Sequence, residues 1–184
     1  MLLIHGAKEN MFDHENMAPL HACAKDGRSE VAMVLGKEEK FINLTDPKFN
    51  MTPLHICALY GQADVAKVLI TKHDIRKSAL DFNKNSPLHL SAYYGHLEIS
   101  KLLLEHETDI KIRNNGTHGY GKSPDDYMAN TKTTDQSKCY TPYDFAVMTE
   151  RDDIIKLMKE NAKGTCIVEE NRNSFRIGSA VTYN

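Results

Sequence analysis

The sequence has no long apolar run and no excess of charge of one sign. None of its apolar stretches approaches the ~20 residues that a membrane-spanning helix requires, and residues 1–4 are too short for the apolar part of a signal peptide. The 23 basic and 25 acidic residues are well mixed and give a net charge of −2. A basic stripe of the kind that nucleic-acid and anionic-membrane binders carry is therefore missing, and we expect neither nucleic-acid binding nor membrane insertion.

Motifs that carry catalysis are also missing. The sequence contains no HExxH, no paired CxxC, no GxSxG and no Walker-type glycine loop. Residues 116–121 are rich in glycine, but they neither follow a strand pattern nor open a strong helix. We therefore expect no enzymatic activity and no cofactor.

One short motif recurs every 34 residues. The segments Ala18-Pro-Leu-His, Thr52-Pro-Leu-His and Ser86-Pro-Leu-His stand in identical phase, and each is followed by a glycine, namely Gly27, Gly61 and Gly95. Recurrence at a fixed interval is typical of a stacked array, in which one unit cannot bury its apolar face alone.

The copy that begins at Thr52 shows the physical logic of the unit. Thr52 is suited to cap a helix, Pro53 to occupy its first position, and Gly61 to end it with a positive φ. A second helix is predicted from the apolar stripe of Val65, Val68 and Leu69. The polar segment 81–85 is turn-rich and predicts a hairpin-like finger before the next proline.

This pattern resembles the ankyrin repeat. Residues 52–58 match the family signature T-P-L-H-x-A, with Cys57 in the first small position, and the resemblance covers about residues 2–163. It implies an all-α solenoid of stacked antiparallel helix pairs with short β-hairpin-like fingers. It also implies a family that works mainly as protein-binding scaffolds without catalysis of their own.

The repeated histidines do not predict a metal site. His21, His55 and His89 share one phase, so in a stack they lie about 10 Å apart. A zinc ion needs its nitrogen ligands within about 2.1 Å, so these three imidazoles cannot converge on one ion. In the ankyrin family this histidine ties adjacent units together through hydrogen bonds.

The cysteines indicate packing rather than disulfides. The chain has four, Cys23, Cys57, Cys139 and Cys166. The first two share a phase with Ser91 and Ala146, so the position accepts any small residue. Free thiols favour a reducing compartment, and we expect a cytoplasmic protein.

The expected domain covers residues 1–163. It contains a partial first repeat and repeats that start near 18, 52, 86 and 141, and residues 164–184 form a C-terminal tail. Ala18 lacks the capping hydroxyl, while Asp144 and Glu150 stand at the histidine and glycine phases of the last unit. The first unit faces an incomplete neighbour, so the chain is either a fragment of a longer protein or docks there on a partner. The tail either frays or pairs with the edge of a partner's sheet.

One interval breaks the period. Pro87 and Pro142 are 55 residues apart, 21 more than the repeat, which predicts an insertion at 117–140. The segment after Ser123 is too short for two helices and a finger, so it carries a helical turn or two at most. Both a binding element and plain disorder remain open for this insertion.

The resemblance also suggests a binding surface. In the family the two residues before the glycine and the finger tips line the concave face, and tyrosines are enriched at interfaces. The predicted partner-binding residues, including two from the insertion, are Lys48, Phe49, Leu59, Tyr60, Asn83, Lys84, Tyr93, Tyr94, Tyr120 and Tyr127. The alternative is that the tyrosine rings pack on adjacent helices.

The expected function is therefore a non-enzymatic adaptor that presents its concave face and its insertion to a protein partner. Two alternatives remain open at this point. One is a structural subunit fixed within a large multiprotein assembly, and the other is a regulatory fragment of a larger enzyme or channel.

Overall fold

The computed structural model describes residues 12–163 except 15, 38, 73, 107, 130–132 and 135–137. The helices are α1 (Pro19–Asp26), α2 (Ser29–Leu35), α3 (Glu39–Ile42), α4 (Pro53–Tyr60), α5 (Ala63–Ile70), α6 (Pro87–Tyr94), α7 (Leu97–Glu105), α8 (Pro124–Met128), α9 (Pro142–Met148) and α10 (Asp152–Lys163). The strands are β1 (Thr117–His118) and β2 (Thr133–Thr134). The predicted partial first repeat at 1–11 and the tail at 164–184 lie outside the described residues.

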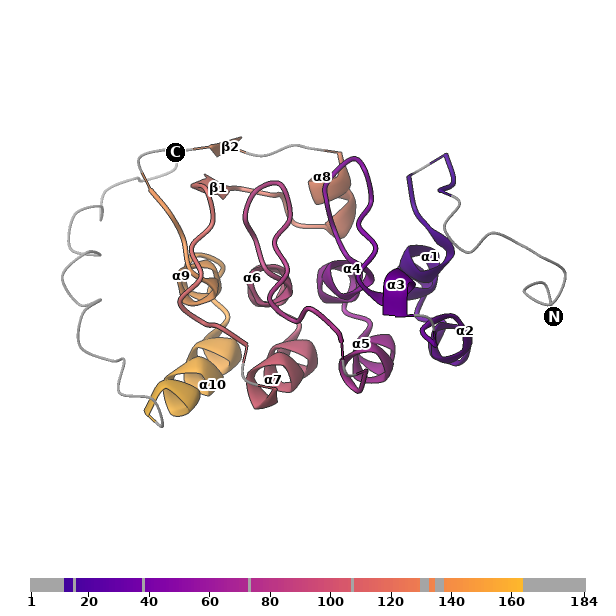
Figure 1. Cartoon of the computed structure of the whole chain (residues 1–184). Coiled ribbons are helices and arrows are strands. Elements are labelled where there is room, and N and C mark those ends of the chain that lie inside the picture. The colour runs from indigo at the N-terminus through magenta and orange to yellow at the C-terminus, as the bar shows by residue number, and fades with distance from the viewer. Residues whose placement is uncertain are drawn as a thin grey trace, which may run out of the picture.

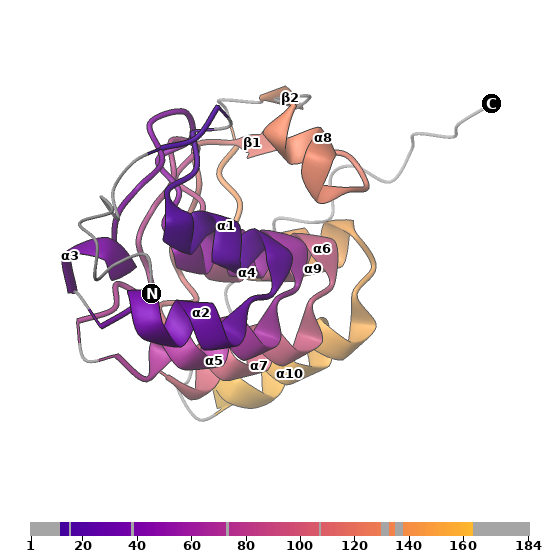
Figure 2. The same cartoon turned by 90° about the vertical axis from the view of Figure 1, so that its right-hand side faces the viewer.

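Stacked helix pairs form the body of the molecule. The pairs α1–α2, α4–α5, α6–α7 and α9–α10 follow one another, and each packs on the next. The first helices make an inner row and the second helices an outer row (Figure 1), and Figure 2 looks along these two rows. The predicted all-α solenoid is confirmed, with one small antiparallel strand pair added by the insertion.

Each first helix begins and ends where the sequence pattern placed it. A proline occupies the first turn of α1, α4, α6 and α9. Left-handed glycines end the first three, with φ of 73° at Gly27, 77° at Gly61 and 81° at Gly95, whereas α9 ends at Met148 and Glu150, with φ of 56°, follows its C-cap Thr149. Glu150 therefore adopts the conformation of the glycine phase that it replaces.

A side-chain clasp closes each finger. The carboxylate of Asp46 accepts hydrogen bonds from the backbone N–H groups of Phe49 at 2.7 Å and Met51 at 2.8 Å. The carboxylate of Asp81 accepts equivalent bonds from Asn83 and Asn85, both at 2.8 Å. Such clasps satisfy the backbone donors of a tight loop and hold its conformation.

The third finger uses the same clasp across the insertion. Oδ1 of Asn114 accepts a hydrogen bond from the N–H of Tyr140 at 3.0 Å, as Asp81 does from Asn85. Tyr140 precedes Thr141 just as Asn85 precedes Ser86. The insertion thus leaves from a finger and returns to it, and the helical stack continues undisturbed.

Buried histidines link consecutive repeats at the N-terminal ends of the inner helices. Nε2 of His21 lies 2.9 Å from the carbonyl oxygen of Met51. The equivalent distances are 3.1 Å from His55 to Asn85 and 3.0 Å from His89 to Tyr140. The predicted role of these histidines as ties between units is confirmed.

The tautomer of these histidines follows from their second nitrogen. The backbone N–H of Thr52 donates to Nδ1 of His55 at 3.1 Å, and that of Ser86 donates to Nδ1 of His89 at 3.1 Å. Nε2 must therefore carry the proton that reaches the next repeat. Burial lowers the pKa of His55 and of His89 to about 4, so both imidazoles are neutral at pH 7.

A second row of ties lies at the C-terminal ends of the inner helices. Nε2 of Gln62 donates to the carbonyl oxygen of Lys25 at 3.0 Å, and Nε2 of His96 lies 3.1 Å from that of Leu59. Both side chains rest on the glycine of the preceding repeat; a Cβ at Gly61 would come within 2.8 Å of the His96 ring. Sequence reasoning missed these ties. The sequence feature that could have predicted them is a long polar residue directly after the glycine, as in Gln62 after Gly61 and His96 after Gly95.

The small-residue position is a packing position, as predicted. Cys23, Cys57, Ser91 and Ala146 are all buried, and burial raises the pKa of both cysteine thiols. Neither thiol is bonded to another cysteine. They fill the core between the two rows of helices.

The first repeat has an incomplete tie. Ala18 provides no side-chain cap for α1, and within the described part of the chain Nδ1 of His21 is a buried atom without a hydrogen-bond partner. We predict that Ala18→Ser raises the free energy of unfolding by about 1 kcal/mol, because the hydroxyl adds both a cap and a partner for Nδ1. Urea unfolding measures this change. Thr52→Ala is the matched control and should lower stability by a similar amount; an unchanged or less stable Ala18→Ser would contradict the assignment.

The histidine ties predict a pH-dependent stability. The unfolded chain takes up protons on these histidines near pH 6.5, whereas folded His89 does so only at about pH 4. Stability is therefore lost as the pH falls through this window, by at most about 1.4 kcal/mol per pH unit for each histidine.

The comparison of wild type with His89→Gln isolates this contribution. The stability advantage of the wild type in urea unfolding should shrink between pH 6.5 and pH 4, while contributions from other titrating groups cancel. His14→Gln, at an exposed position outside the ties, serves as the control. An advantage that stays constant over the window would contradict neutral, buried imidazoles.

Candidate functional site

The insertion lies over the inner row of helices. β1 and β2 pair antiparallel, with Thr117 opposite Thr134 and His118 opposite Thr133. α8 follows Ser123, whose N–H donates to Oδ2 of Asp126 at 2.9 Å. Figure 2 shows α8 beside the fingers, on the side of the inner row that faces away from the outer row. The prediction of a single short helical segment is confirmed, and plain disorder is wrong for the described residues of the insertion.

Tyr127 of α8 anchors the insertion to the second finger. Its hydroxyl donates a very short hydrogen bond to Oδ2 of Asp81, and the side-chain amides of Asn83 and Asn85 donate to the same hydroxyl at 3.2 Å. Burial raises the pKa of Asp81 and of Tyr127. The side chains that close the second finger, those of Asp81, Asn83 and Asn85, thus also bind the insertion.

Tyr120 forms a second anchor, within an aromatic cluster. Its hydroxyl accepts from Nδ2 of Asn85 at 2.8 Å and donates to the carbonyl oxygen of Thr117 at 2.9 Å. Its ring centroid lies 4.6 Å from that of Tyr127, 5.3 Å from Tyr93 and 5.7 Å from Phe145. This cluster fills the groove of the middle repeats with side chains of the chain itself.

Most of the predicted partner-binding residues are interior. Six of the ten are buried, namely Phe49, Leu59, Asn83, Tyr94, Tyr120 and Tyr127. These six therefore have little surface open to a partner, and Tyr120 and Tyr127, which belong to the insertion, are buried against Asn85 and against each other. Tyr93 is half-buried between Tyr94, Tyr120 and Phe145, so the alternative of ring packing holds for it. Lys84 is exposed at a finger tip.

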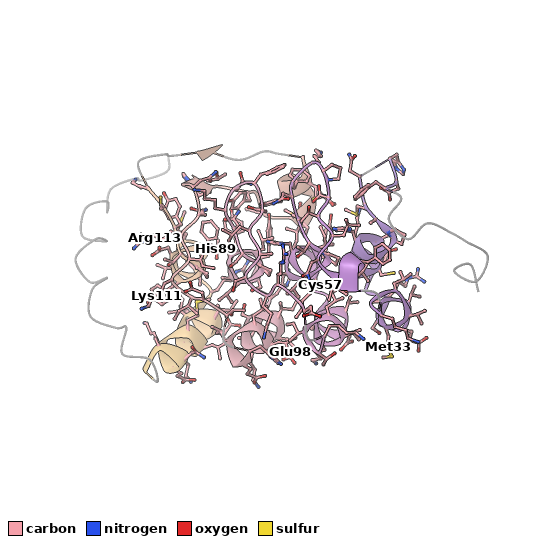
Figure 3. All side chains as sticks on the ribbon, in the orientation of Figure 1. Met33, Cys57, His89, Glu98, Lys111 and Arg113 are labelled. Carbon is pink, nitrogen blue, oxygen red and sulfur yellow. The ribbon has the colours of Figure 1, made fainter. Side chains whose placement is uncertain are left out.

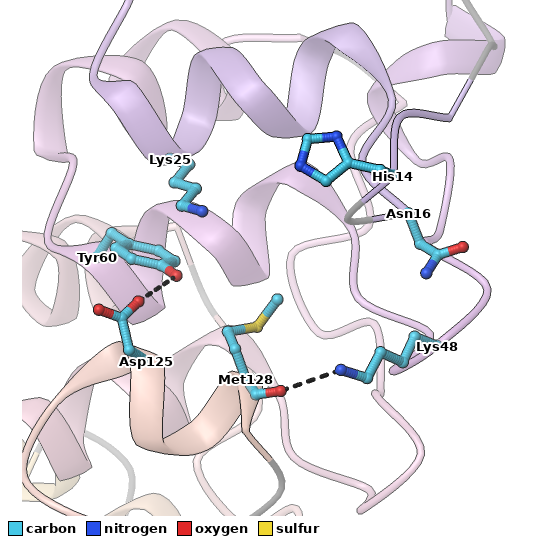
Figure 4. A pocket seen from close by; sticks show the side chains of 7 residues that line it. All are labelled: His14, Asn16, Lys25, Lys48, Tyr60, Asp125 and Met128. Atoms are coloured by element: carbon cyan, nitrogen blue, oxygen red, sulfur yellow. Dashed lines mark hydrogen bonds between the residues drawn. The ribbon is translucent and has the colours of Figure 1, made fainter.

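Tyr60 and Lys48 both line a hollow of about 320 Å³. Figure 4 shows it between α1, α4, the first finger and α8. The lining residues are His14, Asn16, Lys25, Lys48, Tyr60, Asp125 and Met128. The structure thus brings together two of the predicted residues with the C-terminal part of α1, the segment before it and the insertion. We refer to this site as the N-terminal hollow.

Polar contacts hold the walls of the N-terminal hollow in place. Nζ of Lys48 donates to the carbonyl oxygen of Met128 at 3.1 Å and lies 4.7 Å from the centre of the Phe49 ring. The Tyr60 hydroxyl donates to Oδ1 of Asp125 at 3.3 Å (Figure 4). Nζ of Lys25 lies 5.8 Å from the centre of the Tyr60 ring, within the range of a cation–π contact.

A second hollow of about 360 Å³ lies among α6, the part of the insertion before α8, and the turn between α9 and α10. Its lining residues are Tyr93, Tyr94, Gly121, Lys122, Thr149 and Arg151. The Arg151 side chain lies against Gly95, where a Cβ would come within 2.7 Å of Nε. Each of the two hollows thus has a tyrosine wall and two basic side chains beside residues of the insertion.

The comparison with known families agrees with the stack of helix pairs. A family model described as ankyrin repeats in three copies matches residues 1–81 and again residues 38–114. The chain belongs to the ankyrin-repeat family. Members of this family are protein–protein interaction modules and are typically non-catalytic. No match to a curated protein was found.

Among the described residues, no group of three or more His, Cys, Asp or Glu side chains is placed to hold a metal ion. No helix within that part of the chain is long and apolar enough to cross a membrane.

Sequence reasoning missed four of the lining residues of the N-terminal hollow, whereas Lys25 belongs to the pair before Gly27 that the family resemblance places on the concave face. His14 and Asn16 precede the first motif, and Asp125 and Met128 belong to the insertion. Asn16 carries one usable signal. It lies 34 residues before Asn50 and 68 before Lys84, and all three have positive φ, between 58° and 63°. This shared conformation marks residue 16 as the tip of a further finger.

The anchor of the insertion yields a stability prediction. Tyr127→Phe removes the hydroxyl donor to the buried carboxylate of Asp81 and should cost about 1–3 kcal/mol of unfolding free energy. Amide exchange at residues 117–129 should accelerate more than exchange in α4 or α6. Tyr143→Phe is the control, because its hydroxyl takes part in none of these bonds. A Tyr127→Phe chain with wild-type stability and exchange would contradict the anchor.

Proposed function

We propose that the chain is a non-enzymatic adaptor that binds a protein partner in the N-terminal half of its groove. The observation that carries this proposal is the N-terminal hollow, which stays open while the insertion fills the middle of the groove. Family membership supports a protein partner, and the insertion contributes part of the binding surface.

The residues around the N-terminal hollow suit protein recognition. Tyr60 offers a ring and a hydroxyl together, and such side chains are enriched at the energetic centres of interfaces. Met128 adds a flexible apolar side chain beside it (Figure 4). Both are only partly buried, so a partner gains contact area there without opening the core.

A structural subunit of a larger assembly is the second candidate, and apolar side chains exposed on the first described helix pair favour it. Val31, Met33 and Val34 on α2 are 48%, 54% and 51% exposed, and Figure 3 shows Met33 on this pair. Val65 and Ile99, which occupy the phase of Val31 in the next two repeats, are buried. A partner that continues the stack would cover these side chains.

Quantitative capture from the source cell separates the two candidates. The bait chain is compared with a groove variant (Tyr60→Ala with Met128→Ala), an α2 variant (Val31→Lys with Val34→Lys) and a control in the outer row (Lys101→Glu with Lys156→Glu). We expect the groove variant to lose a cross-linked partner by about tenfold or more, equivalent to about 1.4 kcal/mol, while the other two retain it.

Each outcome of this capture is decisive. Loss in the α2 variant alone would replace the adaptor with the structural subunit. Equal capture by all four chains would refute both. Circular dichroism and urea unfolding of each bait exclude losses that come from unfolding.

A further inference from the structure

We propose that the N-terminal hollow binds an acidic segment of the partner protein, with carboxylate side chains placed against Lys25 and Lys48. This inference rests on the proposed function and names the chemistry of the partner. It is carried by the position of the two lysines, by the aromatic wall between them, and by the charge balance of the lining.

The insertion fixes Lys48 at the edge of the N-terminal hollow. Lys48 lies on an exposed finger tip, where a lysine side chain ordinarily samples many rotamers. Here its ammonium group donates to the carbonyl oxygen of Met128 at 3.1 Å and lies over the Phe49 ring at 4.7 Å. An ammonium group has three donors, so a carboxylate that approaches from the hollow still finds a donor already oriented.

Lys25 and Tyr60 form the opposite wall. Nζ of Lys25 lies 5.8 Å from the Tyr60 ring centre, and the Tyr60 hydroxyl is turned toward Asp125. Figure 4 shows the Lys25 side chain pointing from α1 toward the hollow and the plane of the ring. A peptide that enters here meets a cation and an aromatic surface together, which suits an acidic residue next to an apolar one.

The charge balance favours an anion. Among the described residues that line the N-terminal hollow there are two lysines and one carboxylate, Asp125, which accepts a hydrogen bond from the Tyr60 hydroxyl. The whole chain carries a net charge of −2, so this balance is local and opposite in sign. Charge complementarity of this kind steers encounter and selects partners.

The second hollow fits an acidic segment less well, although Lys122 and Arg151 line it. Arg151 lies against Gly95 and so takes part in packing between repeats. The carboxylate of Asp126 lies against two of the residues that line this hollow, because it accepts the backbone N–H of Lys122 at 3.0 Å and a Cβ at Gly121 would come within 2.6 Å of it. An approaching carboxylate would therefore meet negative charge there.

Binding of labelled peptides to the whole chain tests this proposal. The probes are fluorescein-labelled hexaglutamate, its neutral counterpart hexaglutamine, and inorganic phosphate as a competitor. The variants are Lys25→Glu with Lys48→Glu, the second-hollow pair Lys122→Glu with Arg151→Glu, and the outer-row control Lys101→Glu with Lys156→Glu. Fluorescence anisotropy is recorded from about 0.1 M to about 1 M salt, over which the Debye length falls from about 10 Å to about 3 Å.

We expect hexaglutamate to bind at least about tenfold more tightly than hexaglutamine at low salt, and to weaken as salt rises. The Lys25/Lys48 variant should lose about tenfold or more, and the other two variants should keep their affinity. Amide chemical shifts on addition of hexaglutamate should change at Lys25, Lys48 and Tyr60.

Four results would overturn the inference: no binding of hexaglutamate, equal binding of hexaglutamine, displacement by phosphate at equal concentration, or loss only in the Lys122/Arg151 variant. None of them touches the proposed function, which is tested with the uncharged Tyr60 and Met128 substitutions. Capture lost in that variant together with failed peptide binding would leave an adaptor whose partner is not acidic.

Discussion

The hydrogen bond from a buried, neutral imidazole to the carbonyl group just before the next repeat is the interaction on which the stack depends. In this bond Nε2 carries the proton and donates it, while Nδ1 is unprotonated and accepts a hydrogen bond. The backbone N–H groups of Thr52 and Ser86 donate to Nδ1 of His55 and His89 and so enforce that tautomer. Because the imidazole and its carbonyl acceptor belong to different repeats, one bond fixes the position of each unit on its neighbour. The last unit has no described successor to hold, and Asp144 uses its carboxylate to cap its own helix at Thr141.

The location of the insertion follows from the same geometry. The carbonyl that His89 contacts belongs to Tyr140, whose N–H is held by Asn114 on the other side of the insertion. Both ends of the inserted segment are thus tied to the stack, and the segment lies over the groove that the inner helices form. The groove of this protein is therefore a composite of repeat and insertion residues, and its open part is displaced toward the first two repeats.

The sequence predicted those features of the fold that depend on local contacts and recur in each repeat. The proline, glycine and histidine phases fix helix ends and ties through contacts with the next unit, so Gly61 and His55 could be assigned from their spacing. Burial of Tyr94, Tyr120 and Asn83 could not be predicted, because it depends on where a non-repeated segment folds back. The N-terminal hollow combines His14 and Lys48, which are one repeat period apart, with Met128 of the insertion, which belongs to no repeat. The polar ties of Gln62 and His96 were within reach, since both directly follow a glycine phase.

The clasp between Asn114 and Tyr140 has a consequence for engineering. In an ordinary finger, as between Asp81 and Asn85, the clasped residues are four apart, whereas here they are 26 apart with the same bond retained. Lengthening a loop whose ends are already fixed costs little additional closure entropy. The tips of the other fingers thus offer graft points, where a foreign segment could be carried by the scaffold without altering its helices.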